Sequence, residues 1–600
     1  MSWRTKSVDQ VQAEYDRGEL KRSLGPMHLV LLGIGCIIGA GIFVRTGNAA
    51  ALHAGPAVML SFVIAGIVCA FAGLCYAELA SVLPVSGSAY TYTYTTIGEF
   101  GAWIMGSLLL LEYGLAASVV AVGWSGYAVS LLHDIGILIP AEYTQALGKF
   151  VVSQATSFDV LNPLVNLNGV TAHLTDGSVV QFLSSSNAHI SGAYRTALSM
   201  YDVVNPVPTG YALTNAVDIA LRQDTQAVLA SVTSVLDPAS GDLRSLPAGT
   251  SVVAPLGALV QLPAGSIVPV MASHVVSSVL NLPAVLVVLA VTTLLVIGVS
   301  ESATVNNIIV AIKVAVILAF IAVGVFFVNT ANWHPFIPEP TGLPGEFGWS
   351  GILRAATIVF FAYIGFEAVS TAGQEAKNPR RDMPFGILGS LIICTILYMA
   401  TAAVLTGVVS FTKLNVAAPV ATAVDSFGSQ WGWLAKSIKI GAIAGLSSVI
   451  LVLMFGQTRV FYTMSRDGLM PKVLARVHPR FKTPWINTLI VGAIVALAAA
   501  LFDINTLGDL TSVGTLAAFA MVCLAVMWLR RARPDLPRQF KTPLYPVTPI
   551  LGIISCVLLI TRVESKVLHF FAWFMTGAIV AYFLYGYWAS PLGKKAAAPT

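Results

Sequence analysis

Long apolar runs recur along the whole chain and restrict its fold more than any other feature. A helix crosses the hydrocarbon core of a bilayer in about 20 residues. Twelve runs have suitable length and composition, at residues 27–52, 56–82, 100–131, 281–300, 304–328, 350–372, 384–410, 437–462, 485–502, 508–530, 547–561 and 567–589. Only 10% of the residues are charged, whereas about a quarter are charged in soluble proteins. The sequence therefore predicts an all-α polytopic membrane protein with 12 transmembrane helices.

The apolar runs and the loops between them divide the chain into five parts. We expect a cytoplasmic N-terminal segment over 1–26, transmembrane helices 1–3 over 27–133, an inserted domain over 134–280, transmembrane helices 4–12 over 281–590, and a cytoplasmic C-terminal tail over 591–600.

Basic residues indicate which side of the membrane each loop occupies. Five Lys or Arg precede residue 26 and six lie in 455–484, whereas 329–349 holds none. Lys and Arg gather on the cytoplasmic side of membrane proteins. We therefore expect a multi-pass protein of the cell (inner) membrane, with both termini in the cytoplasm and residues 134–280 extracytoplasmic.

The inserted region, residues 134–280, is mostly too polar for a membrane. Two β-rich segments, Val170–Thr175 and Ser178–Leu183, flank Asp176-Gly177, a pair that favours a tight hairpin turn. Tyr211–Leu236 has the apolar spacing of an amphipathic helix. The sequence predicts a small α+β or mostly β domain.

The first apolar run contains an unusual density of glycine. Five glycines occur in the fifteen residues GIGCIIGAGIFVRTG, from Gly33 to Gly47. Each glycine inside a helix costs about 1 kcal/mol relative to alanine. Small residues four apart, such as Gly35 and Gly39, also let helices pack closely. The density favours unwinding, and glycine-interrupted membrane segments mark the substrate sites of transporters.

Four ionisable residues inside apolar runs are candidates for a functional role, because a charge costs about 2.5–3.5 kcal/mol at the helix centre. Glu112 lies near the middle of the third run and could be a structural carboxylate, a counter-charge for a substrate amine or a proton site. Lys313 could exchange a proton near neutral pH or form a static ion pair. Glu367 could bond free backbone groups or carry a proton. Arg354 fits a vestibule or structural role.

Seven sequence blocks together resemble the cationic amino acid transporter family of the amino acid–polyamine–organocation superfamily. They are GIGCIIGAGIFVRTG, LCYAELASVLPVSGSAYTY (74–92), LEYGLAASVVAVGWSGY (111–127), ESATVNNIIVAIKVAV (301–316), FFAYIGFEAVSTAGQEAKNP (360–379), GQTRVFYTMSRDGLMP (456–471) and RPDLPRQFKTPLYPVTP (533–549). The resemblance implies a LeuT-like five-plus-five inverted repeat with helices 1 and 6 broken, plus two trailing helices. The paired breaks would be residues 33–44 and Phe360–Phe366.

By similarity, the two breaks form the substrate site. The amides of Gly39, Ala40 and Gly41 would take the substrate carboxylate, because a freed helix N-terminus is partly positive. The carbonyls of Ile37 or Ile38, with those of Phe361, Ala362 and Ile364, would take the ammonium. Phe361 would also act as a gate, and Leu451 and Glu112 would face the substrate side chain.

The resemblance also implies that Lys313 replaces a sodium ion. Its expected neighbours are the carbonyls of Gly35 and Ile38 and the hydroxyl of Ser447 or Ser448. Together with Glu367, this lysine would couple transport to a proton, so no cofactor and no metal are expected.

Two residues depart from the family pattern. Ala40 stands where a threonine is expected, and Glu367 replaces an aspartate. We expect both changes to leave the fold untouched, and they leave the substrate preference open.

The function expected from the sequence is secondary active uptake of cationic or small neutral α-amino acids by proton symport. An amino acid exchanger is the main alternative, and a nutrient sensor acting through the outer domain is another. No HExxH, Walker A or CxxC pattern occurs, so an enzyme is not expected. The expected partners are the amino acid and the lipid bilayer, without nucleic acid. An accessory membrane subunit or an oligomer remains open.

Overall fold

A computed structural model defines the fold. It describes residue 5, residues 24–83, 88–147, 278–298, 303–340, 344–373, 375–416 and 418–590, and short strands between residues 150 and 277. The chain forms two compact units, one of Met1–Leu138 with Leu282–Thr600 and the other of Ile139–Asn281.

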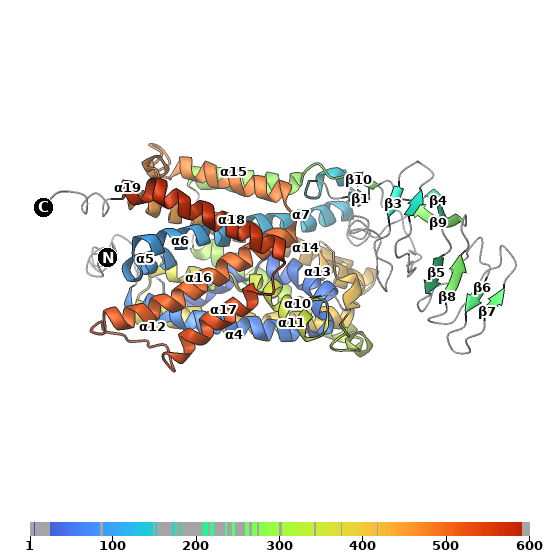
Figure 1. Ribbon diagram of the computed structural model, residues 1–600, viewed down its shortest axis with the longest axis horizontal. Helices are drawn as coiled ribbons and strands as arrows, with labels where there is room; N and C mark the ends of the chain where they lie inside the picture. The colour runs from blue at the N-terminus through green and yellow to red at the C-terminus, as the bar shows by residue number, and fades with distance from the viewer. Residues whose placement is uncertain are drawn as a thin grey trace. The chain divides into compact units, whose positions relative to one another are not determined.

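The first unit is helical (Figure 1). Its α-helices are α2 (Pro26–Ile37), α3 (Thr46–Ala49), α4 (Val58–Val82), α5 (Ser88–Thr96), α6 (Glu99–Leu109), α7 (Ala116–Asp134), α9 (Leu282–Ile297), α10 (Ala303–Gly324), α11 (Gly348–Phe360), α12 (Pro379–Val408), α13 (Pro419–Asp425), α14 (Gly432–Arg466), α15 (Trp485–Leu501), α16 (Ile504–Ala532), α17 (Val547–Ile560), α18 (Ser565–Ala581) and α19 (Tyr587–Ala589).

Short π-helices and 3-10 helices extend or join the α-helices of this unit. The π-helices are η1 (Gly41–Arg45), η2 (Ala50–Ala54), η4 (Leu110–Leu115) and η13 (Tyr582–Gly586). The 3-10 helices are η3 (Gly55–Ala57), η6 (Val325–Phe327), η7 (Thr330–Trp333), η8 (Phe361–Tyr363), η9 (Phe366–Ala372), η10 (Phe411–Lys413), η11 (Ser429–Trp431) and η12 (Lys472–Ala475).

The lengths of these helices suit a bilayer. Among the described residues, eight helical segments are long and apolar enough to cross a membrane. Four further apolar helices are shorter: α2, α9, α15 and α17. The chain is thus a mostly helical polytopic membrane protein, as its apolar runs predict.

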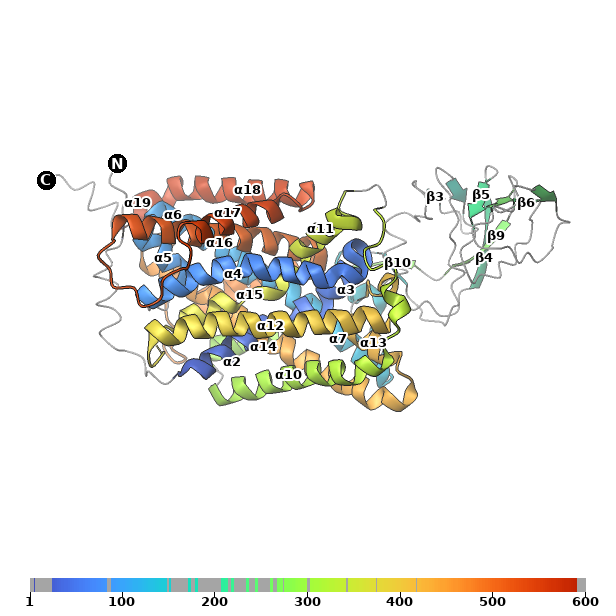
Figure 2. The same cartoon turned by 90° about the horizontal axis from the view of Figure 1, so that it is seen from below.

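Small residues allow close packing around the first helices. Figure 2 shows α12 between α4 and α10, and α12 also packs along α2. A methyl group on Gly33 of α2 would overlap the side chain of Ser390 in α12, and one on Gly441 of α14 would overlap Val316 in α10. In lipid, helix association depends on such packing because the surrounding tails are as apolar as the helices.

The second unit contains antiparallel strands and a 3-10 turn, η5 (Ala141–Tyr143). The strands are β1 (Phe150–Val152), β2 (Thr171–His173), β3 (Val179–Gln181), β4 (Val207–Leu213), β5 (Val217–Ala220), β6 (Ser234–Leu236), β7 (Leu243–Ser245), β8 (Leu259–Leu262), β9 (Ile267–Ala272) and β10 (Val275–Ser277). β1 pairs with β10, and two larger sheets have the strand orders β3-β2-β4-β9 and β5-β8-β6-β7.

Two local predictions in this unit had opposite outcomes. The predicted hairpin strands are confirmed, since β2 and β3 pair with Ala172 opposite Val180; its turn residues lie outside the described residues. The predicted helix over Tyr211–Leu236 is wrong, because the described residues of that stretch belong to the strands β4, β5 and β6. These strands pair with β8 and β9, much later in the chain. Local apolar spacing carries no information about such distant partners.

Candidate functional site

The first glycine-rich segment interrupts its helix. Helix α2 ends at Ile37, Ile38 is extended with φ −73° and ψ 100°, and a π-helix begins at Gly41. The last α2-type hydrogen bond runs from the amide of Ile38 to the Ile34 carbonyl at 2.9 Å. Carbonyls at the end of α2 and amides at the start of η1, including those of Gly39 and Ala40, therefore lie outside regular helical bonding.

The second segment breaks over a longer stretch. Helix α11 ends at Phe360 and the turn η8 carries Phe361 and Ala362. Ile364 is then extended with ψ 130°, and Gly365 has φ 117°, a left-handed conformation that favours glycine. The chain continues as the 3-10 helix η9 rather than as an α-helix.

The two breaks touch each other. A methyl group on Gly41 would overlap the backbone of Ala362. A methyl group on Gly365 would lie 2.9 Å from the carbonyl carbon of Cys36 in α2. Only glycine permits both approaches. The contact places Gly41 of the first break against Ala362 of the second, and Phe361 and Ile364, which neighbour Ala362 in the chain, are buried.

Tyr398 of α12 joins the two breaks. Its hydroxyl lies 2.8 Å from the carbonyl oxygen of Ile37 and 3.0 Å from that of Ala362. Both carbonyls belong to the set predicted to bind the substrate ammonium, and each oxygen has a second lone pair. The sequence reasoning missed Tyr398. The available signal was a tyrosine in the middle of an apolar run, where its hydroxyl needs a partner.

Lys313 lies against the last turn of α2. Its ammonium, which is fully buried, donates to the carbonyl of Gly35 at 2.8 Å. Gly445 of α14 makes room for it, since a Cβ there would lie 3.0 Å from Lys313 Cγ. A cation at the C-terminus of α2 also faces the negative end of the helix dipole.

Glu112 and Glu367 form a buried carboxyl pair. Glu112 lies in the π-helix η4 and Glu367 in η9, and the two groups interact electrostatically. Glu367 Oε2 accepts the amide of Gly365 at 2.9 Å, so this carboxyl group does bond the broken backbone. Neither oxygen of Glu112, nor Oε1 of Glu367, faces a donor among the described residues.

Two tyrosines complete the surroundings of this carboxyl pair. Tyr76 of α4 and Tyr113 of η4 both interact electrostatically with Glu112 and Glu367. Their hydroxyl groups are buried and have no hydrogen-bond partner in the described part of the chain. The cluster is thus a polar region enclosed by apolar helices.

The predicted residues of α14 lie along one helix in different environments. Ser447 donates to the carbonyl of Ile443 at 2.8 Å and accepts from Trp124 Nε1 at 2.9 Å, while Ser448 donates to the Gly445 carbonyl at 3.1 Å. Leu451, one turn further on, is half-buried. The role of these residues beside Lys313 and the substrate side chain stays a prediction.

A third charged group surrounds Asp509 of α16. Asp509 Oδ1 accepts from Arg45 of η1 at 2.9 Å, and Oδ2 accepts from Arg354 of α11. Sequence reasoning gave Arg354 a vestibule or structural role but missed Arg45 and Asp509. The signal was available, because both are charged residues within apolar runs.

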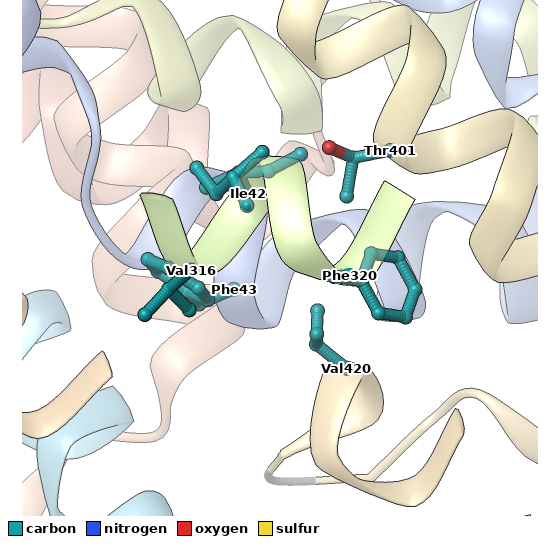
Figure 3. A pocket seen from close by; sticks show the side chains of 7 residues that line it. Ile42, Phe43, Val316, Phe320, Thr401 and Val420 are labelled. Carbon is teal, nitrogen blue, oxygen red and sulfur yellow. The ribbon is translucent and has the colours of Figure 1, made fainter. Parts of the chain in front are cut away.

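An apolar recess lies beside η1 (Figure 3). It is lined by the side chains of Ile42, Phe43, Val316, Ile317, Phe320, Thr401 and Val420. It has a single hydroxyl and no charged group, so it lacks the chemistry to hold a zwitterion. The polar groups that suit an amino acid lie at the breaks themselves.

Comparison with known proteins identifies the family of the chain. The model of the amino acid permease family matches residues 24–593. Over 586 residues, 97% of each chain, the protein is 37% identical to the branched-chain amino acid permease BcaP of Bacillus subtilis (strain 168). It is 35% identical to the methylthioribose transporter of the same organism over 99% of each chain. It is 31% identical to cationic amino acid transporter 9, chloroplastic, of Arabidopsis thaliana over 85% of this chain and 67% of the relative. The chain therefore belongs to the amino acid permease family of the amino acid–polyamine–organocation superfamily, as its sequence motifs predict.

Proposed function

We propose that the protein is a secondary active transporter that takes up α-amino acids, cationic or small neutral, together with protons by alternating access. Membership of a permease family makes it a transporter and not an enzyme. One observation carries the proposal: two interrupted helices meet through Gly41 and Ala362 inside a membrane protein. Irregular backbone at membrane depth is tolerated where it is covered by protein or lines a site.

The proposed topology has twelve spans. The four shorter apolar helices α2, α9, α15 and α17 would complete the eight longer segments. The breaks would then lie in the first and sixth spans, at equivalent positions of a five-plus-five inverted repeat, with α17 and α18 trailing. Both termini would be cytoplasmic and residues 134–280 extracytoplasmic in the cell (inner) membrane. Labelling of single cysteines in exposed loops of intact cells tests this sidedness.

The substrate would bind across the two breaks. Its carboxylate would accept from the amides of Gly39, Ala40 and Gly41, where the start of η1 is partly positive. Its ammonium would donate to the carbonyls of Ile37 and Ala362, which Tyr398 already orients. These contacts recognise the α-amino acid unit and leave the side chain to the region of Leu451 and Glu112.

Proton coupling would use two buried groups on different elements. Lys313 holds the end of α2 through the Gly35 carbonyl, and loss of its proton would weaken that contact. Glu112 and Glu367 place two carboxyl groups together, and two such groups in one buried site cannot both ionise readily. A shared proton would supply the donor that their free oxygens lack. Each event would bias the packing of one break, as alternating access requires.

Phe361 would close the site. It is buried beside the second break, and the guanidinium carbon of Arg45 lies 5.9 Å from its ring centroid. Movement of the aromatic ring would open the breaks to the side that carries Arg45. A small-residue variant, Phe361→Ala, should therefore speed substrate release in counterflow assays.

Uptake by proteoliposomes tests the whole proposal. The panel contains radiolabelled leucine, arginine, lysine and methylthioribose, which represent the substrates that the names of the relatives give, and alanine as a small neutral amino acid. Accumulation of an amino acid that follows an imposed inward proton gradient supports symport. Accumulation of methylthioribose alone would overturn the amino acid assignment.

Two alternatives are separable in the same vesicles. An exchanger would show counterflow without a gradient and no net uptake. A sensor acting through the insertion would bind ligand with negligible transport, and deletion of residues 139–281 would abolish its response. Uptake that survives this deletion unchanged makes the insertion accessory.

A further inference from the structure

Two buried arginines share one buried carboxylate at the end of the bundle where α16 begins. Arg45, Arg354 and Asp509 are exposed by only 1%, 6% and 3%. Asp509 accepts from the Nη2 atoms of both arginines, so each of its oxygens holds one guanidinium. The cluster joins η1, α11 and α16.

The remaining donors of Arg45 are only partly matched. Its Nη1 donates to the carbonyls of Ile504 at 3.0 Å and Asn505 at 3.3 Å. Its Nε is buried and has no hydrogen-bond acceptor among the described residues. A methyl group on Gly508 would overlap this guanidinium, so the helix start is shaped to admit the arginine.

Arg354 is incompletely matched as well. Its Nη1 is buried and lacks an acceptor in the described part of the chain. Glu564 lies 3.8 Å from Arg354 Nη2, but its side chain is 51% exposed and also pairs with Lys566 at 2.8 Å. The other charged groups that act on the two arginines are Asp503, which attracts Arg45, and His53, which bonds the Gly345 carbonyl at 2.8 Å.

The buried part of the cluster thus has two cations and one anion. An unpaired donor on a buried charged group is costly, because it has lost water without gaining a protein acceptor. Guanidinium groups match carboxylates especially well, since their fork of N–H groups fits two oxygens. A second small anion would supply acceptors to Arg45 Nε and Arg354 Nη1.

We propose that Arg45 and Arg354 form a second binding site for one small monovalent anion, either the carboxylate of an arriving amino acid or a halide. The site is closed in this structure, since both free N–H groups are fully buried. The anion would compete with Asp509 for the arginines and loosen the link between η1, α11 and α16. Because Arg45 lies over Phe361, this loosening would act beside the gate. The carboxylate source rests on the proposed transport function, whereas anion binding itself does not.

Thermal unfolding of the purified full chain in detergent tests the site. The probes are sodium acetate, compared with neutral acetamide, and sodium chloride, compared with the bulkier gluconate. A saturable rise in Tm with acetate identifies a carboxylate site, and one with chloride alone identifies a halide site; either result supports the proposal. No rise with either anion overturns it.

Two variants should shift the anion affinity in opposite directions. Arg354→Gln removes a donor and should weaken the apparent affinity at least about tenfold, the usual scale for a hydrogen bond to a charged group. Asp509→Asn removes the competing carboxylate and should tighten it by a similar factor. Arg562→Gln, an exposed arginine near Glu564, should leave it unchanged.

The pair of variants separates binding from a merely structural role. If the cluster only holds the helices together, both substitutions lower Tm and neither changes the anion dependence, which would overturn the site. If Arg354→Gln does not fold, the higher anion affinity expected of Asp509→Asn still tests the proposed site. This assay measures anion binding by Tm and does not use uptake. If the protein binds anions but does not transport amino acids, the transport proposal is contradicted and the anion site is not.

Discussion

The two breaks differ in how they are held. Neighbouring helices hold the first break, because Lys313 of α10 bonds the Gly35 carbonyl and Tyr398 of α12 bonds that of Ile37. The second break holds itself in part, because the Glu367 carboxylate accepts the amide of Gly365 two residues earlier. A change elsewhere in the bundle can therefore move the first break more readily than the second.

This difference suggests that the two breaks have different roles in transport. The first break, a short interruption at Ile38 and Gly39, is placed to respond to the charge on Lys313. The second consists of two 3-10 turns, Phe361–Tyr363 and Phe366–Ala372, and carries its own ionisable group, Glu367. Substitutions that affect both breaks, one break or a single proton site should separate these roles.

The largest effect is expected where the breaks touch. Gly41→Ala places a methyl group in the backbone of Ala362, and overpacking of this kind costs about 1–3 kcal/mol or more. Substrate affinity in a counterflow assay should fall about a hundredfold or be lost. The matched control is Gly73→Ala in α4, whose Cβ would lie 3.6 Å from Leu388 Cδ2, an ordinary contact. Equal loss in both variants would mean that the contact with Ala362 is not special.

Removal of the ammonium should affect the first break alone. Lys313→Met keeps the side-chain stem against Gly445 but removes the donor to the Gly35 carbonyl. Uptake driven by a pH gradient should disappear, while exchange of internal for external substrate continues. Lys436→Ala, at an exposed lysine of α14, is the control. Gradient-driven accumulation at the normal level in Lys313→Met would rule out its role in proton coupling.

Loss of the shared hydroxyl should have a smaller effect on both breaks. Tyr398→Phe removes the single hydroxyl proton that the carbonyls of Ile37 and Ala362 share, and should weaken substrate binding about tenfold, or about 1.4 kcal/mol. Tyr127→Phe removes one bond, to the Phe43 carbonyl beside the first break, and should cost less. Scintillation proximity binding measures both. If Tyr127→Phe were the more damaging, Tyr398 would not be the link between the breaks.

The sequence predicted the helical membrane fold and the first break because these depend on local properties, whereas the second break was expected from family resemblance. Apolar length identifies the spans, and the glycines between Gly33 and Gly41 identify the interruption. The same reasoning placed Lys313 near Gly35 only through family resemblance. Gly41 and Gly365 illustrate the limit, because their need for glycine comes from Ala362 and Cys36, which are distant in sequence.

The partners of residues that act across the bundle could not be predicted. The sequence shows that the Tyr398 hydroxyl needs an acceptor, but the carbonyls of Ile37 and Ala362 are identified only when α12 is placed between the two breaks. Arg45 and Asp509 are 464 positions apart, and nothing in either segment indicates that they pair. The strands in place of the expected helix over Tyr211–Leu236 show the same limit, because their partners lie far along the chain.

The smallest effect on rate, and the most specific, is expected at the second break. Glu367→Gln keeps an oxygen that can accept the Gly365 amide, but it cannot ionise and so resembles the protonated acid. If transport requires the protonated pair, uptake by the unmodified protein should fall as pH rises, because Glu367 and Glu112 lose their shared proton. At acidic pH, uptake by Glu367→Gln should stay within about twofold of that by the unmodified protein, because the hydrogen bond to the Gly365 amide is retained. At alkaline pH, uptake by the variant should decline less than uptake by the unmodified protein.

Glu112→Gln is the matched variant for this test, because it removes the other ionisable group without touching the backbone of the second break. Initial uptake rates between acidic and alkaline pH, at fixed membrane potential, give the comparison. A flattened pH profile in both variants assigns the proton to the pair. A flattened profile in Glu367→Gln alone assigns the proton to the second break. If both profiles match that of the unmodified protein, Glu367 is only a backbone acceptor, and proton coupling then depends on Lys313 and the first break.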